Sequence, residues 1–153
     1  MNRRTLLKSS IAASVVTVAA GAGLLAPGQL LAAYPKAAFA AKDSSAALTA
    51  ALGVGEYSES SDIKIKAPDI AENGSVVPVT VTSKIDAVES ISILSEANAS
   101  PLIASFNLVA AEPYISTRIK MGKTGNVVAV VKAGGKLYAA KKEVKVTIGG
   151  CGG

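Results

Sequence analysis

From Gly55 onward, apolar and polar residues alternate along the chain with a period of two. Successive side chains of a β-strand point to opposite faces, so this alternation predicts strands that each bury one face. Glycine, proline and asparagine interrupt the pattern every 8–14 residues or so, a spacing typical of a β-sandwich. We therefore predict an all-β fold, an antiparallel β-sandwich. The expected strands cover residues 63–66, 76–82, 88–94, 102–108, 114–121, 127–132 and 137–148.

Turn and breaker residues refine this prediction. Asn73-Gly74 is a strong turn signal, and Gly134-Gly135 predicts a two-residue hairpin turn. Pro78 lies inside a predicted strand and has no N–H for the ladder, which predicts an edge strand or a bulge. The alternation of residues 114–121 is explained by burial, so we favour a plain strand over an enzyme-docking face there. Exposed edges also leave room for sheet-side pairing with a partner.

A short helix is predicted ahead of the strands. Residues 42–52 contain a run of alanine and leucine, both of which have high helix propensity. Asp43 or Ser44 can cap its N-terminus, and Gly53 can end it. The predicted domain, residues 41–148, is thus a sandwich with a short N-terminal helix.

The first 40 residues have the layout of an export signal. Arg3 and Arg4 are followed by an uncharged stretch rich in alanine, valine, glycine and leucine, with no acidic residue before Asp43. A twin arginine with a modestly apolar stretch is typical of the Tat route. Ala38-Phe39-Ala40 fits a small-x-small cleavage site, so residues 1–40 are predicted to be a signal peptide. A membrane anchor is the alternative, but glycines and a proline interrupt the stretch.

Removing this segment changes the charge of the protein. The full chain has 16 basic and 11 acidic residues and a formal charge of +5. Without residues 1–40, 12 basic and 11 acidic residues remain, so the formal charge falls to about +1. No nucleic-acid footprint remains, and the mature form is predicted to contain no membrane segment.

The C-terminus carries the one cysteine of the chain. Cys151 has two glycines on each side, and the five residues 149–153 are predicted to form a flexible arm. Glycine has no side chain to dock the segment and no strong backbone preference. Fully extended, five residues span at most about 17 Å. The arm would therefore present one thiol on a slim tether. The glycines are Gly149, Gly150, Gly152 and Gly153.

The residues needed for several kinds of catalysis are missing. The chain has no histidine and no tryptophan. Without an imidazole, a Cys–His nucleophile is excluded, and a single sulfur cannot build a Cys/His metal site. No CxxC, P-loop or GxGxxG motif is present. We therefore predict no cofactor, no metal site and no catalytic residue in this chain.

Three rival interpretations of Cys151 stay open. A tail cysteine can serve only as a disulfide between two copies, although that bond requires a fixed geometry that a glycine arm does not provide. The chain can also be a redox-active thiol enzyme or a structural exported sandwich, such as an adhesin or pilus-like subunit. We favour a covalent carrier whose thiol is activated in the pocket of another enzyme, because a free thiol is mostly protonated near pH 7.

The chain closely resembles the SoxY family, the sulfur carriers of the thiosulfate-oxidising Sox system. The resemblance rests on the Tat-type signal, on residues 67–79 and 113–122, and on the terminal Gly-Gly-Cys-Gly-Gly. It implies an immunoglobulin-like sandwich in the periplasm, paired with SoxZ as a heterodimer. It also implies that Cys151 carries thiosulfate-derived sulfur species. SoxXA would attach thiosulfate there, SoxB would release sulfate, and SoxCD, where present, would oxidise the remaining sulfane sulfur.

Overall fold

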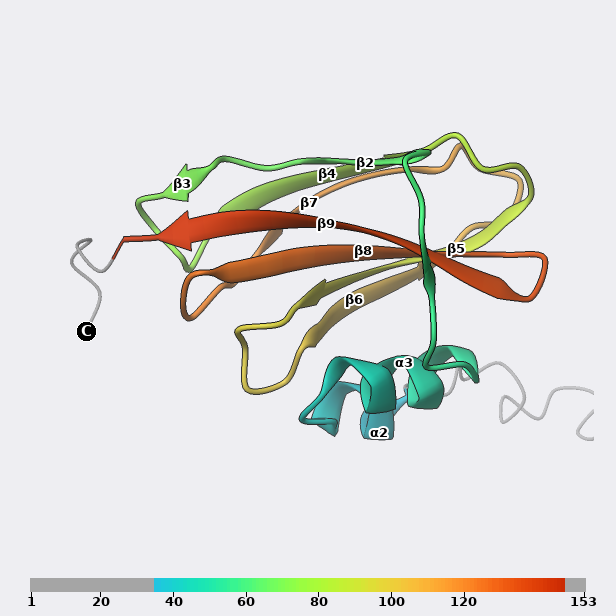
Figure 1. Cartoon of the computed structure of the whole chain (residues 1–153), viewed down its shortest axis with the longest axis horizontal. Helices are drawn as coiled ribbons and strands as arrows, with labels where there is room; N and C mark the ends of the chain where they lie inside the picture. The colour runs from blue at the N-terminus through green and yellow to red at the C-terminus, as the bar shows by residue number, and fades with distance from the viewer. Residues whose placement is uncertain (1–34, 148–153) are drawn as a thin grey trace, which may run out of the picture. The chain divides into compact units, whose positions relative to one another are not determined.

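The computed structural model describes residues 35–147, and the predicted signal up to residue 34 and the arm lie outside the described residues. The described part is built of two short helices followed by nine strands (Figure 1). The helices are α2 (Lys36–Ala40) and α3 (Ser44–Leu52). The strands are β1 (Ser58–Glu59), β2 (Ile63–Lys66), β3 (Ile70–Ala71), β4 (Val77–Ser83), β5 (Val88–Ser95), β6 (Leu102–Asn107), β7 (Tyr114–Ile119), β8 (Gly125–Ala133) and β9 (Lys136–Val146).

The strands form two sheets. The larger sheet has the order β1-β9-β8-β5-β6, with β3 also pairing with β9, and the smaller has the order β2-β4-β7. All pairs are antiparallel except β1 with β9 and β3 with β9, which are parallel. The chain between β1 and β3 thus leaves the edge of β9, joins the smaller sheet as β2 and returns. The predicted immunoglobulin-like β-sandwich is confirmed.

The main core lies between the two sheets. Alternate residues of the middle strand of the smaller sheet point inward, and Val77, Val79 and Val81 are buried. They pack in one cluster with Ile91 and Ile93 of β5, the pair that the sequence places on one face. The larger sheet adds inward residues of its central strand β8, namely Val127, Ala129 and Val131.

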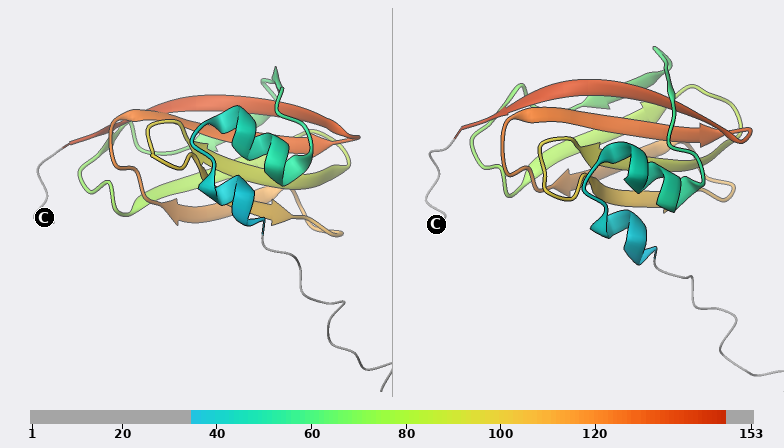
Figure 2. Two further views of the ribbon diagram at one scale, coloured as in Figure 1. Left: turned by 90° about the horizontal axis from the view of Figure 1, so that it is seen from below. Right: turned by 60° about the horizontal axis from the view of Figure 1, so that its bottom comes forward.

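A second core lies on the other face of the larger sheet. There the two helices lie across the strands (Figure 2). Ala38 of α2 and Ala47 and Leu48 of α3 are fully buried. The sheet side of this cluster consists of Leu94, Leu102, Val128, Val130, Leu137 and Ala139. The central strands β8 and β5 are therefore buried on both faces, which explains the continuous apolar run of residues 127–131 in β8, whereas β5 buries serines between its apolar residues.

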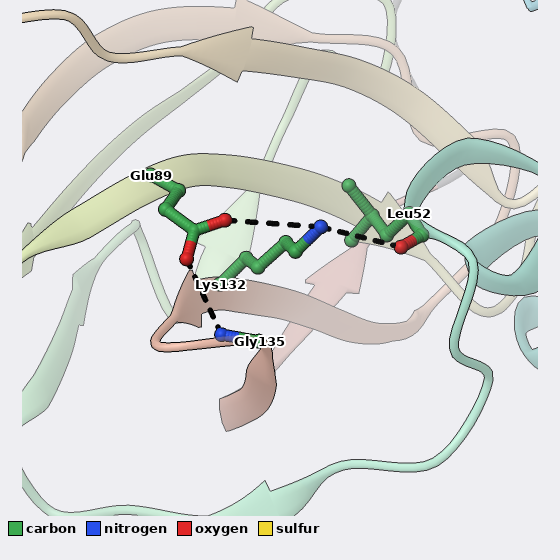
Figure 3. Close-up of polar contacts among 4 residues, drawn as sticks. All are labelled: Leu52, Glu89, Lys132 and Gly135. Carbon is green, nitrogen blue, oxygen red and sulfur yellow. Dashed lines mark hydrogen bonds and ion pairs between the residues drawn. The ribbon is translucent and has the colours of Figure 1, made fainter.

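Helix α3 begins and ends where the sequence predicts. The Asp43 carboxylate accepts a hydrogen bond from Ala46 N at 2.8 Å, which satisfies one N–H of the first turn. At the other end Gly53 adopts φ +82°, a left-handed conformation that glycine reaches without a Cβ penalty. Lys132 Nζ of β8 donates to the Leu52 carbonyl at 3.5 Å and lies 3.8 Å from the Glu89 carboxylate (Figure 3). The helix end is thereby fixed to the larger sheet.

Two sequence-predicted turns are confirmed. Gly134 and Gly135 have φ of +56° and +73° and join β8 to β9 as a two-residue hairpin turn, the backbone that such hairpins require. At the opposite end of the sandwich, Asn73 Oδ1 accepts a hydrogen bond from Ser75 N at 2.9 Å. This bond closes the turn that precedes β4.

The prediction of an edge strand or a bulge at Pro78 is wrong. β4 is the middle strand of the smaller sheet, and its register with β7 runs without a shift from Val77 to Thr82. The proline is tolerated because β2 ends at Lys66, opposite Thr80. Pro78 lies beyond that point, where β4 pairs with β7 alone. The N–H that proline lacks can therefore weaken the pairing with one strand at most.

Candidate functional site

The residues that the sequence assigns to the site lie outside the described residues. These are Cys151 with Gly149, Gly150, Gly152 and Gly153, and the export residues Arg3 and Arg4. What the structure describes is the segment that leads to the predicted arm, residues 145–147 at the end of β9 and after it. We call this segment, with the side chains and strands that hold it, the root of the arm.

One edge of the root pairs with the short strand β3. Ile70 lies opposite Lys145, and Ala71 lies opposite Val146. Lys145 N donates to the Asp69 carbonyl at 2.9 Å, and Thr147 N donates to the Ala71 carbonyl at 3.1 Å. The ladder therefore continues one residue past the end of β9, up to the last residue that the structure describes.

The other edge of the root is held by a single hydroxyl. Thr124 Oγ1 accepts a hydrogen bond from Val146 N at 2.9 Å and donates to the Val146 carbonyl at 3.4 Å. This side chain takes the place of a neighbouring strand, because the ladder of β8 with β9 stops at the pair Gly125–Val144. Both edges of the root are thus hydrogen-bonded, which fixes the position and direction of the backbone there.

A turn from the smaller sheet packs against the same residue. Met121 N donates to the Gly74 carbonyl at 2.7 Å. A Cβ placed on Gly74 would lie 2.8 Å from Val146 Cγ1, so only glycine lets the turn approach this closely. The neighbouring loop is held by Asn98, whose side chain accepts from Gly122 N at 2.9 Å and donates to the Lys120 carbonyl at 2.7 Å.

A charged cluster lies further back along β9. Lys141 Nζ lies 2.9 Å from the Glu96 carboxylate, and Asn126 Nδ2 donates to the same carboxylate at 2.9 Å. The Asn126 hydrogen bond, together with Lys141, lowers the pKa of Glu96. The hydrogen bond to Glu96, with a further contribution from Tyr57, raises the pKa of Lys141. The lysine is therefore held as a cation in an ion pair, a state unsuited to a general base.

The described residues offer little for catalysis. Among residues 35–147, no group of three or more histidine, cysteine, aspartate or glutamate side chains is placed to hold a metal ion. A hollow of about 440 Å³ lies beside β1 and β9, and Glu59 is its one carboxylate. No helix in the described range is both long and apolar enough to span a membrane. The hollow is lined by Glu59, Ser60, Ser61, Ile63, Ala139, Ala140 and Lys141.

The sequence predicts the tail but not the contacts that hold its root. The Asn73-Gly74 turn and the end of β9 were both predicted. Nothing in their local pattern indicates that Gly74 packs against Val146 or that Thr124 binds it, because the three segments are far apart in sequence. The isolated threonine in the loop before β8 was the one available signal, since Thr hydroxyls commonly bind nearby backbone groups.

The fold and the root define a class: an immunoglobulin-like β-sandwich protein whose last described strand ends five residues before the cysteine. The profile of the sulfur oxidation protein SoxY family matches residues 48–151. The chain belongs to the SoxY family. This membership supports a carrier role in sulfur oxidation.

A solved structure supports the same assignment. The sulfur carrier protein SoxY from Chlorobium limicola f thiosulfatophilum is 50% identical in sequence and superimposes with a TM-score of 0.63. The match covers 73% of this chain and 97% of that chain. No curated protein matches the sequence.

Proposed function

We propose that this chain carries sulfur-oxidation intermediates as covalent adducts on Sγ of Cys151 and presents them to separate enzymes. The family match, which extends to residue 151, is the observation that carries the proposal. The carrier is not itself a catalyst in this proposal, because its thiol has no histidine partner anywhere in the chain.

The contacts at the root of the arm support separate roles for the two parts of the chain: the sandwich fixes the starting point of the tail, and the tail carries the thiol. Val146 is bound on one edge by Thr124 and lies on the other beside Ala71, and Thr147 donates to Ala71. The starting point of the last six residues is therefore fixed, and four glycines flank the one thiol. A slim segment of this kind can enter a narrow channel where any Cβ would collide.

The chemistry on the thiol follows from the two-electron oxidation that joins it to thiosulfate. The Cys151 thiol and thiosulfate form an S–S bond, giving Cys-S–S–SO3⁻, and release one proton and two electrons to the attaching enzyme, for which the family implies the haem protein SoxXA. Hydrolysis of the S–SO3 bond, the step implied for SoxB, consumes one water and gives sulfate, two protons and a cysteine persulfide anion. Where SoxCD is present, it would oxidise the sulfane sulfur with three waters, giving Cys-S–SO3⁻, six protons and six electrons that pass to that enzyme. Hydrolysis of the remaining S–SO3 bond by a further water then gives sulfate, one proton and the free thiol, so the modification is reversible and the carrier can be used again.

The setting of this function is also part of the proposal. The chain is exported to the periplasm through its Arg3-Arg4 signal and pairs there with SoxZ. An oxidising compartment normally pairs cysteines as disulfides, and a single cysteine avoids an intramolecular bond. The strands β6 and β7 each end a sheet with one neighbouring strand, so either edge could accept a partner strand.

The decisive experiment replaces the sulfur of Cys151. Cys151→Ser should abolish thiosulfate-dependent sulfate release when it is added to periplasmic enzymes from a strain that lacks the chain, whereas wild-type chain should restore it. Intact-mass spectra of wild-type chain from thiosulfate-grown cells should show added S2O3 or sulfur units that the variant lacks. Ser90→Ala, at a position of β5 opposite Lys132 and near the Gly134-Gly135 hairpin, serves as the control. Sulfate release by Cys151→Ser at the wild-type rate would refute the proposal.

A further inference from the structure

The outer face of the smaller sheet is exposed and carries only positive charge. Its two flanking strands contribute Lys64 and Lys66 from β2 and Arg118 from β7, and Lys120 follows directly after β7. All four residues are exposed. Between them β4 presents Pro78, Thr80 and Thr82, which alternate with its buried valines. We call this surface the cationic face.

No acidic residue neutralises the cationic face from within its sheet. The strands β2, β4 and β7 contain no aspartate or glutamate. Within the described residues, the ion pairs of Lys132, Lys141 and Lys142 all belong to strands of the larger sheet, and none involves a residue of the cationic face. The helices cover the larger sheet on the opposite side of the molecule (Figures 1 and 2). The four charges are therefore directed to solvent without a partner.

Two residues of this face are of the types that anchor protein interfaces. Arg118 is the one arginine of the chain outside the signal, and its guanidinium can bind a carboxylate through two parallel hydrogen bonds. Tyr114, at the other end of the same strand, is 55% exposed. Tyrosine and arginine are both enriched among the residues that dominate binding energy. Between them Ser116 bonds to Thr80 across the strands at 3.2 Å.

The cationic face ends beside the root of the arm. Lys120 immediately precedes Met121, whose N–H binds the Gly74 carbonyl. Gly74 in turn packs against Val146, the last residue of β9. A macromolecule bound to the cationic face would therefore lie next to the point from which the chain continues to Cys151.

We infer that the cationic face is a docking surface for an acidic patch on the enzymes that process the cargo, with Arg118 and Tyr114 as anchors. This inference reverses the preference for a plain strand at residues 114–121, because only the inward side chains of that strand are explained by burial. This inference rests on the proposed carrier function. A second copy of the chain fits less well, because pairing this face with itself would oppose like charges. An anionic membrane also fits less well, because Tyr114 is the one large apolar side chain that the face could insert, and peripheral binding combines charge with buried apolar area.

Charge reversal on the cationic face provides the test. In the periplasmic assay described above, the concentration of carrier that gives half-maximal sulfate release is measured for K64E/K66E/R118E. Electrostatic steering changes association rates by about 10–10³-fold, so this concentration should rise at least about tenfold while the rate at saturation changes little. Raising the salt from about 0.1 M to about 1 M, which shortens the screening length from about 10 Å to about 3 Å, should weaken wild type and leave the variant almost unaffected.

A matched variant controls for net charge. K42E/K136E makes the same change in charge as the double face variant K64E/R118E, at exposed positions outside both the cationic face and the root of the arm, and should behave as wild type. Should K64E/R118E melt early, K64Q/R118Q is compared with K42Q/K136Q instead. Equal effects of the face and control variants, or no effect of either, would overturn the inference.

The other occupants and the carrier function are tested separately. K64E/K66E/R118E is also tested for binding to phosphatidylglycerol vesicles and for self-association in sedimentation. If the variant loses either property while its sulfate release is unchanged, the face belongs to a membrane or to a second copy, and the inference is overturned. Cys151→Ser distinguishes the two proposals. If it is inactive while the face variant is normal, only the docking surface is wrong, whereas an active Cys151→Ser would refute the carrier function itself.

Discussion

Gly74 is the residue whose size matters most at the root of the arm. A Cβ there would meet both the Met121 backbone and Val146 Cγ1, whereas a Cβ on Gly122 would find only Asn98 Oδ1, at 3.8 Å. Neither glycine has a positive φ, so alanine tests space alone. Packing, not backbone conformation, therefore distinguishes the two positions.

Gly74→Ala should lower the free energy of unfolding by about 1–3 kcal/mol, the usual range for overpacking. Gly122→Ala should change it by less than about 0.5 kcal/mol. Urea unfolding followed by circular dichroism measures both. Equal stability of the two variants would show that the contact between the turn and Val146 is loose.

The Glu96 carboxylate gives the domain a dependence on acid pH. Because its hydrogen bond to Asn126 and its pairing with Lys141 lower its pKa in the folded state, the stabilisation is present above the unfolded pKa of about 4.3. It is lost as the pH falls through the lower, folded pKa. The side chain is 32% exposed, so screening limits the gain to about 1 kcal/mol or less.

Glu96→Gln should therefore be less stable than wild type at pH 7, and the difference should disappear as the pH falls through the folded-state pKa. Thermal unfolding at a series of pH values measures this. Adding Lys141→Gln to the variant should reduce stability little further, since the partner charge is already gone. A difference that persists unchanged at acid pH would contradict the assigned cause.

At the scale of elements, helix α2 is the feature that local sequence concealed. Residues 36–40 fall in the segment assigned to the signal, yet they form a helix whose Ala38 is buried against the larger sheet. The cleavage site after residue 40 remains a prediction, but burial of Ala38 favours a cut ahead of Pro35. The intact mass of the exported chain would decide between the two sites.

Ala38→Asp should destabilise the exported domain by about 3 kcal/mol or more, because an unpaired charge would be buried. Ala37→Asp adds the same charge to the same helix at an exposed position and serves as the control. Thermal melts of the two exported variants give the comparison. If cleavage follows residue 40 in wild type, Ala38→Asp alters the small-x-small site itself and should leave the signal uncleaved, whereas Ala37→Asp should be removed with the signal and melt as wild type.

The seven longer strands could be predicted because each carries its own signal. Alternation, a β-branched run or flanking turns mark every strand from β4 to β9, and also β2. β1 and β3 are two residues long, too short to show a period, and their parallel pairing with β9 depends on contacts distant in sequence. The prediction of an edge strand or a bulge at Pro78 failed for a related reason. The rule against proline in a central strand applies only where a neighbouring strand is present on both sides of the proline.

At the scale of the whole molecule, the predicted export signal accounts for four of the five net positive charges, and the cationic face holds four of the 12 basic residues outside it. If Arg3 and Arg4 direct export by the Tat route, changing both to lysine should leave the chain in the cytoplasm. Lys8→Arg, which keeps the pair intact, should be exported normally. Immunoblots of periplasmic and cytoplasmic fractions measure the distribution, and normal export of the paired variant would refute the Tat assignment.

The pairing of β3 with the end of β9 has a mechanical consequence. β3 runs parallel to β9, and β8 runs antiparallel along its other edge. A pull on the tail along the strand axis would load the hydrogen bonds of both ladders together, in shear, instead of peeling them apart one by one. An enzyme that binds the C-terminus could therefore exert a force on it without unfolding the sandwich.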